Sequence, residues 1–192
     1  MNRNAFFAFV HRIKFIQRWG LMRNTSTENL KEHSYDVAVI AHGIATIGTT
    51  CYGREYNPDR ICASAMFHDI NEALTGDMPT PVKYSNPVIT RAYKDIEAEA
   101  GKRLLGMLPD GLSEIYRGYM DPSPEERLII KAADKISAYV KCLEEKQAGN
   151  RDFKSAELAL KKIVEGYSPE EIVHFVREFL PAYGITLDEI EK

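Results

Sequence analysis

Residues 64–84, SAMFHDINEALTGDMPTPVKY, carry side chains whose types and spacing could do chemistry. His68 and Asp69 are adjacent in this stretch, and Glu72 follows them. Imidazole and carboxylate groups that rigid elements deliver are ligands for divalent transition metals. On one continuous helix, His68 and Asp69 would lie about 100° apart around the axis, with Glu72 over the same patch. The stretch therefore predicts a metal-assisted site at the end of a helix.

Two residues far away in the sequence have the right character to complete such a site. His33 continues the apolar stripe of the preceding predicted helix, and Asp134 lies in the apolar run IIKAADKISAYV, where a lone carboxylate is costly. Taken singly, a buried histidine is usually a hydrogen-bonded core residue, and an aspartate is usually a cap or a surface ion pair. Their joint occurrence with His68 and Asp69 favours a metal site.

The elements that must position these residues are all predicted to be helices. Apolar residues recur at helical spacing in nearly every long segment, and we find no alternating strand pattern and no internal repeat. Thr25 and Glu28 have capping-box spacing at the start of the second helix, and Asn57 with Pro58 is typical of a helix start. Helices are expected over about residues 5–18, 25–48, 57–74, 86–108, 110–118, 123–149, 153–165 and 169–182.

Composition narrows the function classes. The chain has 192 residues, of which 44% are apolar and 28% charged, as in ordinary globular domains, and its net charge is −3. A basic surface for a nucleic-acid polymer or an anionic membrane is not expected. Three widely spaced cysteines lack a C-x-x-C pair, which favours a reducing cytoplasm. The apolar run over residues 4–19 is interrupted by charges and lacks a cleavage site, so we expect no signal peptide.

At the candidate ligands the chain resembles a known family. His33, the pair His68 and Asp69, and the distant Asp134 match the H…HD…D signature of the HD-domain metal-dependent phosphohydrolases. The stretches RWGLMRNTSTENLKEHS and HDINEALTGDMPTPVKY look like those of the bacterial 5′-deoxynucleotidases of the YfbR type, and the resemblance covers nearly the whole chain. It implies one all-α HD-domain helical bundle over residues 1–192, which hydrolyses deoxyribonucleoside 5′-monophosphates to deoxyribonucleosides and phosphate.

The resemblance also implies roles for individual residues. The four signature residues would hold one divalent metal, with cobalt or manganese suggested, and the protein would be a homodimer. Glu72 matches the acid–base glutamate, and Arg18 matches a residue that orients the phosphate, so both are expected to be catalytic. The implied substrate-binding set is Arg18, Trp19, His33, Asp69, Asp77, Thr80, Pro81, Val82, Lys83 and Asp134.

These residue types suit the hydrolysis of a phosphate monoester. The expected reaction is attack by metal-bound water in line with the leaving 5′-oxygen, with Glu72 orienting that water or moving a proton. Arg18 can grip the phosphate with its planar fork, and Lys83 could add a second positive charge. Asp77 is expected to accept a hydrogen bond from the 3′-hydroxyl, while a wall near the 2′-carbon, such as Trp19, would reject ribonucleotides.

Two alternatives remain open from the sequence. One is an HD phosphohydrolase that acts on another nucleotide; such groups often use extra histidines for a second metal, and this chain has few to spare. The other is a non-catalytic HD-type signalling module, which typically loses ligands or the acid–base residue, whereas this chain keeps His33, His68, Asp69, Asp134 and Glu72. The native metal and the base preference are left open.

Overall fold

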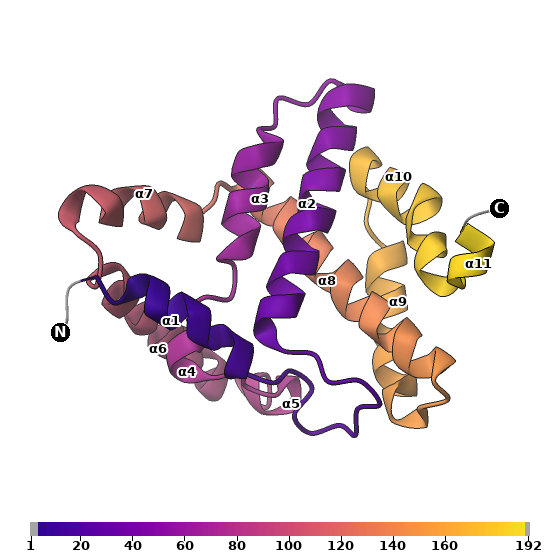
Figure 1. Ribbon diagram of the computed structural model, residues 1–192, viewed down its shortest axis with the longest axis horizontal. Coiled ribbons are helices and arrows are strands. Elements are labelled where there is room, and N and C mark those ends of the chain that lie inside the picture. Colours follow the sequence, from indigo (N-terminus) through magenta and orange to yellow (C-terminus); the bar gives the residue numbers. More distant parts are fainter. Residues whose placement is uncertain (1–3, 191–192) are drawn as a thin grey trace.

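The computed structural model describes residues 4–190, and its regular structure there is helical (Figure 1). Apart from one isolated antiparallel bridge between Gln17 and Asn29, no β-structure occurs in this part of the chain, which confirms the all-α prediction. None of the helices within residues 4–190 is long and apolar enough to cross a bilayer. The elements are α1 (Phe6–Arg12), η1 (Ile13–Phe15), α2 (Leu30–Tyr52), α3 (Pro58–Met66), α4 (Glu72–Thr75), α5 (Thr80–Lys83), α6 (Pro87–Leu105), α7 (Asp110–Met120), α8 (Pro124–Gln147), η2 (Arg151–Phe153), α9 (Lys154–Glu165), α10 (Glu170–Glu178), η3 (Leu180–Gly184) and α11 (Leu187–Ile190).

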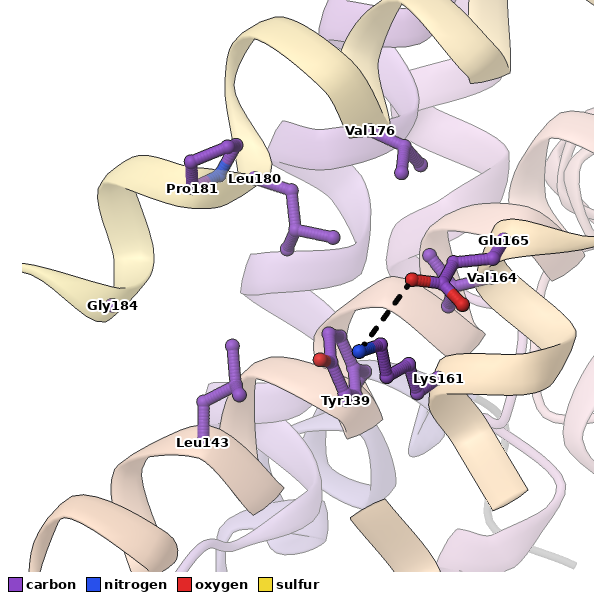
Figure 2. Close-up of a pocket in the computed structure, with 9 residues that line it drawn as sticks. All are labelled: Tyr139, Leu143, Lys161, Val164, Glu165, Val176, Leu180, Pro181 and Gly184. Atoms are coloured by element: carbon purple, nitrogen blue, oxygen red, sulfur yellow. Dashed lines mark ion pairs between the residues drawn. The ribbon is translucent and has the colours of Figure 1, made fainter. Parts of the chain in front are cut away.

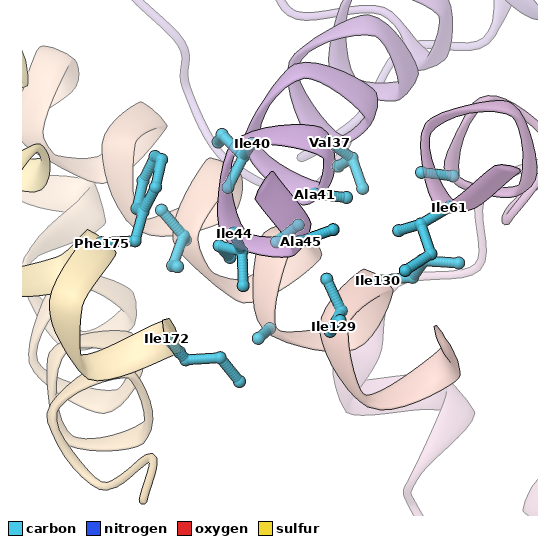
Figure 3. Packing of buried hydrophobic residues seen from close by; sticks show 14 of the residues in the cluster. Val37, Ile40, Ala41, Ile44, Ala45, Ile61, Ile129, Ile130, Ile172 and Phe175 are labelled. Atoms are coloured by element: carbon cyan, nitrogen blue, oxygen red, sulfur yellow. The ribbon is translucent and has the colours of Figure 1, made fainter. Parts of the chain in front are cut away.

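The two longest helices, α2 and α8, cross in the middle of the molecule (Figure 1). Fully buried alanines, Ala41 and Ala45 on α2 and Ala132 and Ala133 on α8, keep the side chains between these helices small. Isoleucines and Phe175 from α3, α8 and α10 complete this first apolar cluster (Figure 3). Each fully buried isoleucine stabilises the fold by roughly 1.5–3 kcal/mol, so the cluster fixes how α2 and α8 are placed.

A second apolar cluster packs α1 against α4 and α6. Phe6 and Leu104 are completely buried in it, and Ile70 joins them from the short segment between α3 and α4. Ala65, five residues before Ile70, belongs to the first cluster instead. The segment over residues 67–71 therefore spans the boundary between the two clusters, and its backbone is anchored on both sides.

Helix starts follow the predicted capping chemistry at two positions and differ at a third. Asn57 caps α3, and Ser123 caps α8 in a capping box with Glu126. The predicted capping box of Thr25 and Glu28 is wrong: α2 begins one turn later, where Asn29 and Glu32 form the box. The reason is that the Thr25 and Glu28 side chains bond to other parts of the molecule, as described below.

The predicted bounds of two further helices need correction. The N-terminal helix, expected over residues 5–18, ends at Arg12, and after one 3-10 turn the chain becomes extended at Ile16. The third helix, expected over residues 57–74, ends at Met66. Both breaks lie next to predicted site residues, so Arg18, Trp19, His68 and Asp69 lie on irregular backbone instead of the predicted helices.

A buried ion pair fastens the loop over residues 16–29 to α8. The side chain of Glu145 is 1% exposed and accepts hydrogen bonds from the Thr25 hydroxyl at 2.6 Å and the Asn150 amide at 2.7 Å. Lys141, 4% exposed, donates both to Glu145 and to the Ser26 carbonyl. Because both charges are buried and hydrogen-bonded, removing one would leave the other without a partner.

We expect Glu145→Gln to destabilise the protein by about 3–5 kcal/mol at neutral pH, because the Lys141 charge would stay buried and unpaired. Burial opposes ionisation, yet hydrogen bonds from Lys141, Thr25 and Asn150 lower the pKa of Glu145 below its ordinary value of 4.5. A lowered pKa gives stability that is present above 4.5 and lost as the pH falls below it. The difference between variant and wild type, measured by denaturant unfolding, should therefore shrink in acid.

Glu144→Gln is the matched control, since Glu144 is the exposed neighbour on the same helix. Equal stability of the Glu145→Gln variant and the wild type at neutral pH would contradict the role given to this ion pair.

Candidate metal centre

His68 is positioned by the break that ends α3. Phe67 has φ −109° and ψ 7°, and the backbone N–H groups of Phe67 and His68 donate to the carbonyls of Ser64 and Ala65, three residues back. The His68 ring also donates from Nδ1 to the Ala65 carbonyl, at 2.8 Å. A carbonyl can only accept, so Nδ1 carries a proton and Nε2 is the ring nitrogen left for a ligand. His68 and Asp69 thus lie in a tight turn, not on the predicted continuous helix.

Two other elements bring their side chains to the same point. His33 on α2 is completely buried, with Nε2 3.2 Å from Oδ1 of Asp134 on α8 and Nδ1 3.1 Å from the Ser137 hydroxyl. The His33 and His68 rings lie with centroids 5.3 Å apart. One potential ligand atom from each of His33, His68 and Asp134 lies within 4.8 Å of the others. These three predicted ligands therefore converge from three separate elements.

Asp69 lies next to His68, but the group defined by the 4.8 Å distance does not include it. Its Oδ2 lies 3.0 Å from His68 Nε2 and 3.8 Å from Arg18 Nη1. The set within 4.8 Å, taken over residues 4–190, holds His33, His68 and Asp134. Asp69 as a fourth ligand stays a prediction.

The chemistry of the site fits a divalent cation. His68 Nε2 is buried and makes no aligned hydrogen bond, although Asp69 is close. Burial lowers the pKa of His68, but the carboxylates of Asp69 and Asp134 outweigh it and raise the pKa to about 9, so a positive charge is favoured at this point. Imidazole nitrogens with carboxylates suit manganese, cobalt or zinc better than calcium, which takes oxygen ligands.

Glu72, at the start of α4, is a buried acid beside the centre. Only 6% of its surface is exposed, and its Oε2 has no hydrogen-bond partner. Burial, followed by the charges of Asp69 and Asp77, raises the pKa of Glu72 to about 9. Gly76 has φ +74°, a conformation that glycine adopts without strain, and the chain turns there. Half-buried Asp77 follows this turn, and its charge acts on Glu72.

The four consecutive residues of the predicted substrate-binding set, 80–83, form one helical turn, α5. Thr80, Pro81 and Val82 are exposed on it. Lys83 is not a free cation, because its Nζ lies 2.8 Å from Oε1 of Glu97 on α6. Its charge is thus largely neutralised.

Arg18 and Trp19 lie in the irregular segment after η1, and both bond to one carboxylate. Glu28 Oε2 accepts from Arg18 Nε at 3.1 Å and from Trp19 Nε1 at 2.8 Å. The Trp19 ring packs on Phe153 with centroids 5.2 Å apart. Arg18 thereby reaches Asp69, and Trp19 lies on the same loop.

Three residues of the site were missed by the sequence interpretation. Glu28 was assigned to a capping box, Ser137 bonds to His33, and Lys135 Nζ lies 2.9 Å from Asp134 Oδ2. Ser137 follows Asp134 by three residues on an apolar helix, so its spacing was a usable signal. Nothing local marks Glu28, because its partners lie across a loop.

A cavity of about 220 Å³ lies elsewhere, between α8, α9 and the segment around η3 (Figure 2). Its polar groups include Lys161 and Glu165, which form an ion pair 3.7 Å apart on one helix. None of the predicted site residues lines it, so it does not bear on the metal centre. The lining residues are Tyr139, Leu143, Lys161, Val164, Glu165, Val176, Leu180, Pro181 and Gly184.

Comparison with known proteins finds close relatives. A family model described as 5′-deoxynucleotidase YfbR-like matches residues 5–183. A 5′-deoxynucleotidase of Vibrio cholerae is 47% identical over 193 residues, covering 99% of this chain and all of the relative.

Two solved structures share the fold at low identity. An HD-domain phosphohydrolase from Listeria innocua superposes with a TM-score of 0.83 at 23% identity, covering 100% of this chain and 94% of that one. An HD phosphohydrolase of cyanophage S-2L, bound to dA and one catalytic Zn²⁺ ion, gives a TM-score of 0.63 at 19% identity, covering 91% and 96%. At these identities the likeness concerns the fold alone.

We expect His68→Gln to weaken Mn²⁺ binding by more than about tenfold, because it removes a buried ring nitrogen of the cluster that has no hydrogen-bond partner. Titration calorimetry on chelator-treated protein measures this. His42→Gln is the matched control: the His42 side chain is 44% exposed and lies near Asp59, outside the cluster. Equal weakening by the two substitutions, or by neither, would contradict the assignment.

Proposed function

Because the chain belongs to the YfbR-like 5′-deoxynucleotidase family, we propose that the cluster of His33, His68 and Asp134 is its catalytic metal centre. The protein is a 5′-deoxynucleotidase, a metal-dependent hydrolase of phosphate monoesters. The observation that carries the proposal is the meeting of these three ligands beside the buried acid Glu72. A signalling module without catalysis would have no need of that acid.

One divalent ion would be held by His33, His68, Asp69 and Asp134, with cobalt or manganese as our choice. Bound there, the ion would polarise a phosphoryl oxygen and lower the pKa of a water molecule. The single catalytic Zn²⁺ of the cyanophage S-2L enzyme supports one metal rather than two in this fold, and makes zinc a third candidate.

Arg18 binds and orients the phosphate. Its Nε donates to Glu28, while Nη1 lies 3.8 Å from Oδ2 of Asp69. A guanidinium used in this way presents its outer N–H groups to a phosphate, and such charge-assisted hydrogen bonds are short and strong. Lys83 contributes less than expected, because Glu97 already neutralises it.

Glu72 handles the proton. When water attacks, its oxygen bonds to phosphorus, the bond from phosphorus to the 5′-oxygen breaks, and that oxygen must gain a proton while the water loses one. Glu72 is buried beside the ligands, and its raised pKa keeps the carboxyl group protonated at neutral pH, so it can deliver its proton to the 5′-oxygen and take up the one that the water loses. Nothing in the site requires a covalent intermediate.

Asp77 and the residues after it read the sugar. A half-buried carboxylate can accept a hydrogen bond from the 3′-hydroxyl, and a substrate without that hydroxyl would leave it unpaired. Trp19 is our candidate for the wall near the 2′-carbon. Thr80, Pro81 and Val82, exposed on α5, would complete the nucleotide-binding surface.

The homodimer and the cytoplasmic location stay proposals. Exposed apolar side chains of the C-terminal half, including Leu158, Val173 and Phe179, would suit an interface with a second copy. The cysteine spacing favours a reducing compartment.

The first test is phosphate release from dAMP, AMP and 3′-dAMP by chelator-treated protein, with manganese, cobalt, zinc or magnesium restored one at a time. We expect release from dAMP with a transition metal and little from the other two, because Asp77 would lose its partner in 3′-dAMP and the wall would exclude AMP. Release from none of the three under any metal would reject the function, and equal release from AMP and dAMP would reject the sugar-reading pocket.

Replacement of the acid gives a second test. Glu72→Gln should lower kcat for dAMP by about 10²–10⁴-fold, since the proton transfer is lost. Binding of Mn²⁺ should be retained, because Glu72 is not a proposed ligand. Glu55→Gln, at an exposed site on the α2–α3 loop, is the control. An unchanged kcat in the Glu72→Gln variant would remove Glu72 from the mechanism.

A further inference from the structure

Glu28 is a buried carboxylate to which the reaction above gives no task. Only 8% of its surface is exposed. Its Oε2 accepts hydrogen bonds from both Arg18 and Trp19, and its Oε1 lies 4.0 Å from His33 Nδ1. One carboxylate therefore contacts three residues of the site: Arg18, Trp19 and His33.

The backbone holds Glu28 in register with Arg18. The Arg18 N–H donates to the Glu28 carbonyl at 2.9 Å, and the Leu30 N–H donates to the Ile16 carbonyl at 2.9 Å. These bonds close the two ends of the loop against each other. The distance between the Glu28 and Arg18 side chains is thus set by the chain itself and not by the ion pair alone.

The geometry of the ion pair decides which edge of the guanidinium faces the centre. The Glu28 carboxylate accepts a hydrogen bond from Nε of Arg18, and Nη1 of Arg18 lies 3.8 Å from Oδ2 of Asp69. A fork that binds a phosphate must be held at one angle, because misplacement of a binding group by about 1 Å can cost about a hundredfold in rate. Without Glu28, Arg18 would be free to turn toward Asp69 and Asp134, whose charges attract it.

Trp19 has an unusual backbone conformation, and its side chain bonds to the same carboxylate. Its φ is +58°, a left-handed value that bulky residues rarely adopt. Backbone bonding at Met22 supports this turn, with the Met22 N–H donating to the Trp19 carbonyl at 2.8 Å. The indole N–H bonded to Glu28 then fixes the direction of the ring. Backbone strain of this kind gathers at functional sites.

We propose that Glu28 is a positioning residue for the hydrolysis, which sets the angle of the Arg18 guanidinium for the phosphate and the direction of the Trp19 ring for the sugar. It touches no reacting atom. The inference rests on the proposed function for the roles of Arg18 and Trp19, but the orientation itself can be measured without turnover.

The test is Glu28→Gln, which keeps the shape and loses the charge. We expect kcat/KM for dAMP with Mn²⁺ to fall about tenfold to a hundredfold. The chain has a single tryptophan, so its fluorescence reports Trp19 alone, and we expect a red shift as the ring moves toward water. Mn²⁺ affinity should stay at the wild-type value. Glu32→Gln, in the capping box of α2, is the control and should change neither activity nor emission.

A double-mutant cycle separates positioning from general damage. If Glu28 acts in part through Arg18, then Glu28→Gln should lower kcat/KM less in an Arg18→Ala background than in the wild type, because only the part that acts through Trp19 remains. Fully additive losses, or a folded Glu28→Gln variant with wild-type kcat/KM and wild-type emission, would overturn the proposal. If Glu28→Gln does not fold, Glu28→Asp, which keeps the charge but moves it back, is judged by the same criteria. Failure of the proposed function would show separately, as wild-type protein inactive on dAMP with every metal.

Discussion

The hydrogen bond from the His68 ring to the Ala65 carbonyl is the contact on which the metal centre depends. It forms where α3 ends at Met66, and the Ala65 carbonyl there accepts from both the backbone N–H and the ring of His68. The same bond fixes the tautomer and leaves the opposite nitrogen, Nε2, for a ligand, in the group that His68 forms with His33 and Asp134. The same hydrogen bond thus caps the end of α3 and orients the His68 ring as a ligand.

The position of this break follows from the packing on either side. Ala65 belongs to the cluster around α2 and α8, and Ile70 to the cluster around α1 and α6. A continuous helix would carry one of them away from its cluster, so the chain turns between them. His68 and Asp69 occupy that turn, and Glu72 begins the next helix. The turn that carries His68 and Asp69 therefore lies between the two apolar clusters, and each cluster anchors one end of it.

Local chemistry accounts for what the sequence predicted well. Asn57 and Ser123 cap helices because their side chains accept from the nearest backbone N–H groups, which needs no distant partner. His33, His68 and Asp134 were found because ionisable residues in apolar helical runs are costly without a task. Long-range contacts account for the failures. Glu28 was predicted to be a capping residue, but its carboxylate accepts hydrogen bonds from Arg18 and Trp19 instead. Apolar spacing continues past Met66, so periodicity could not show the break, and Glu97 neutralises Lys83 from another helix.

The separation of the ligands along the chain has a consequence for synthesis. His33 and Asp134 are 101 residues apart, and the Glu145 side chain that fastens the Arg18 loop comes later still. A chain emerging from the ribosome holds three of its four proposed ligands early and cannot close the centre until α8 has left the exit tunnel and packed on α2. The centre can thus close only after α8 has been synthesised, and a nascent chain that lacks α8 cannot hold the complete set of ligands.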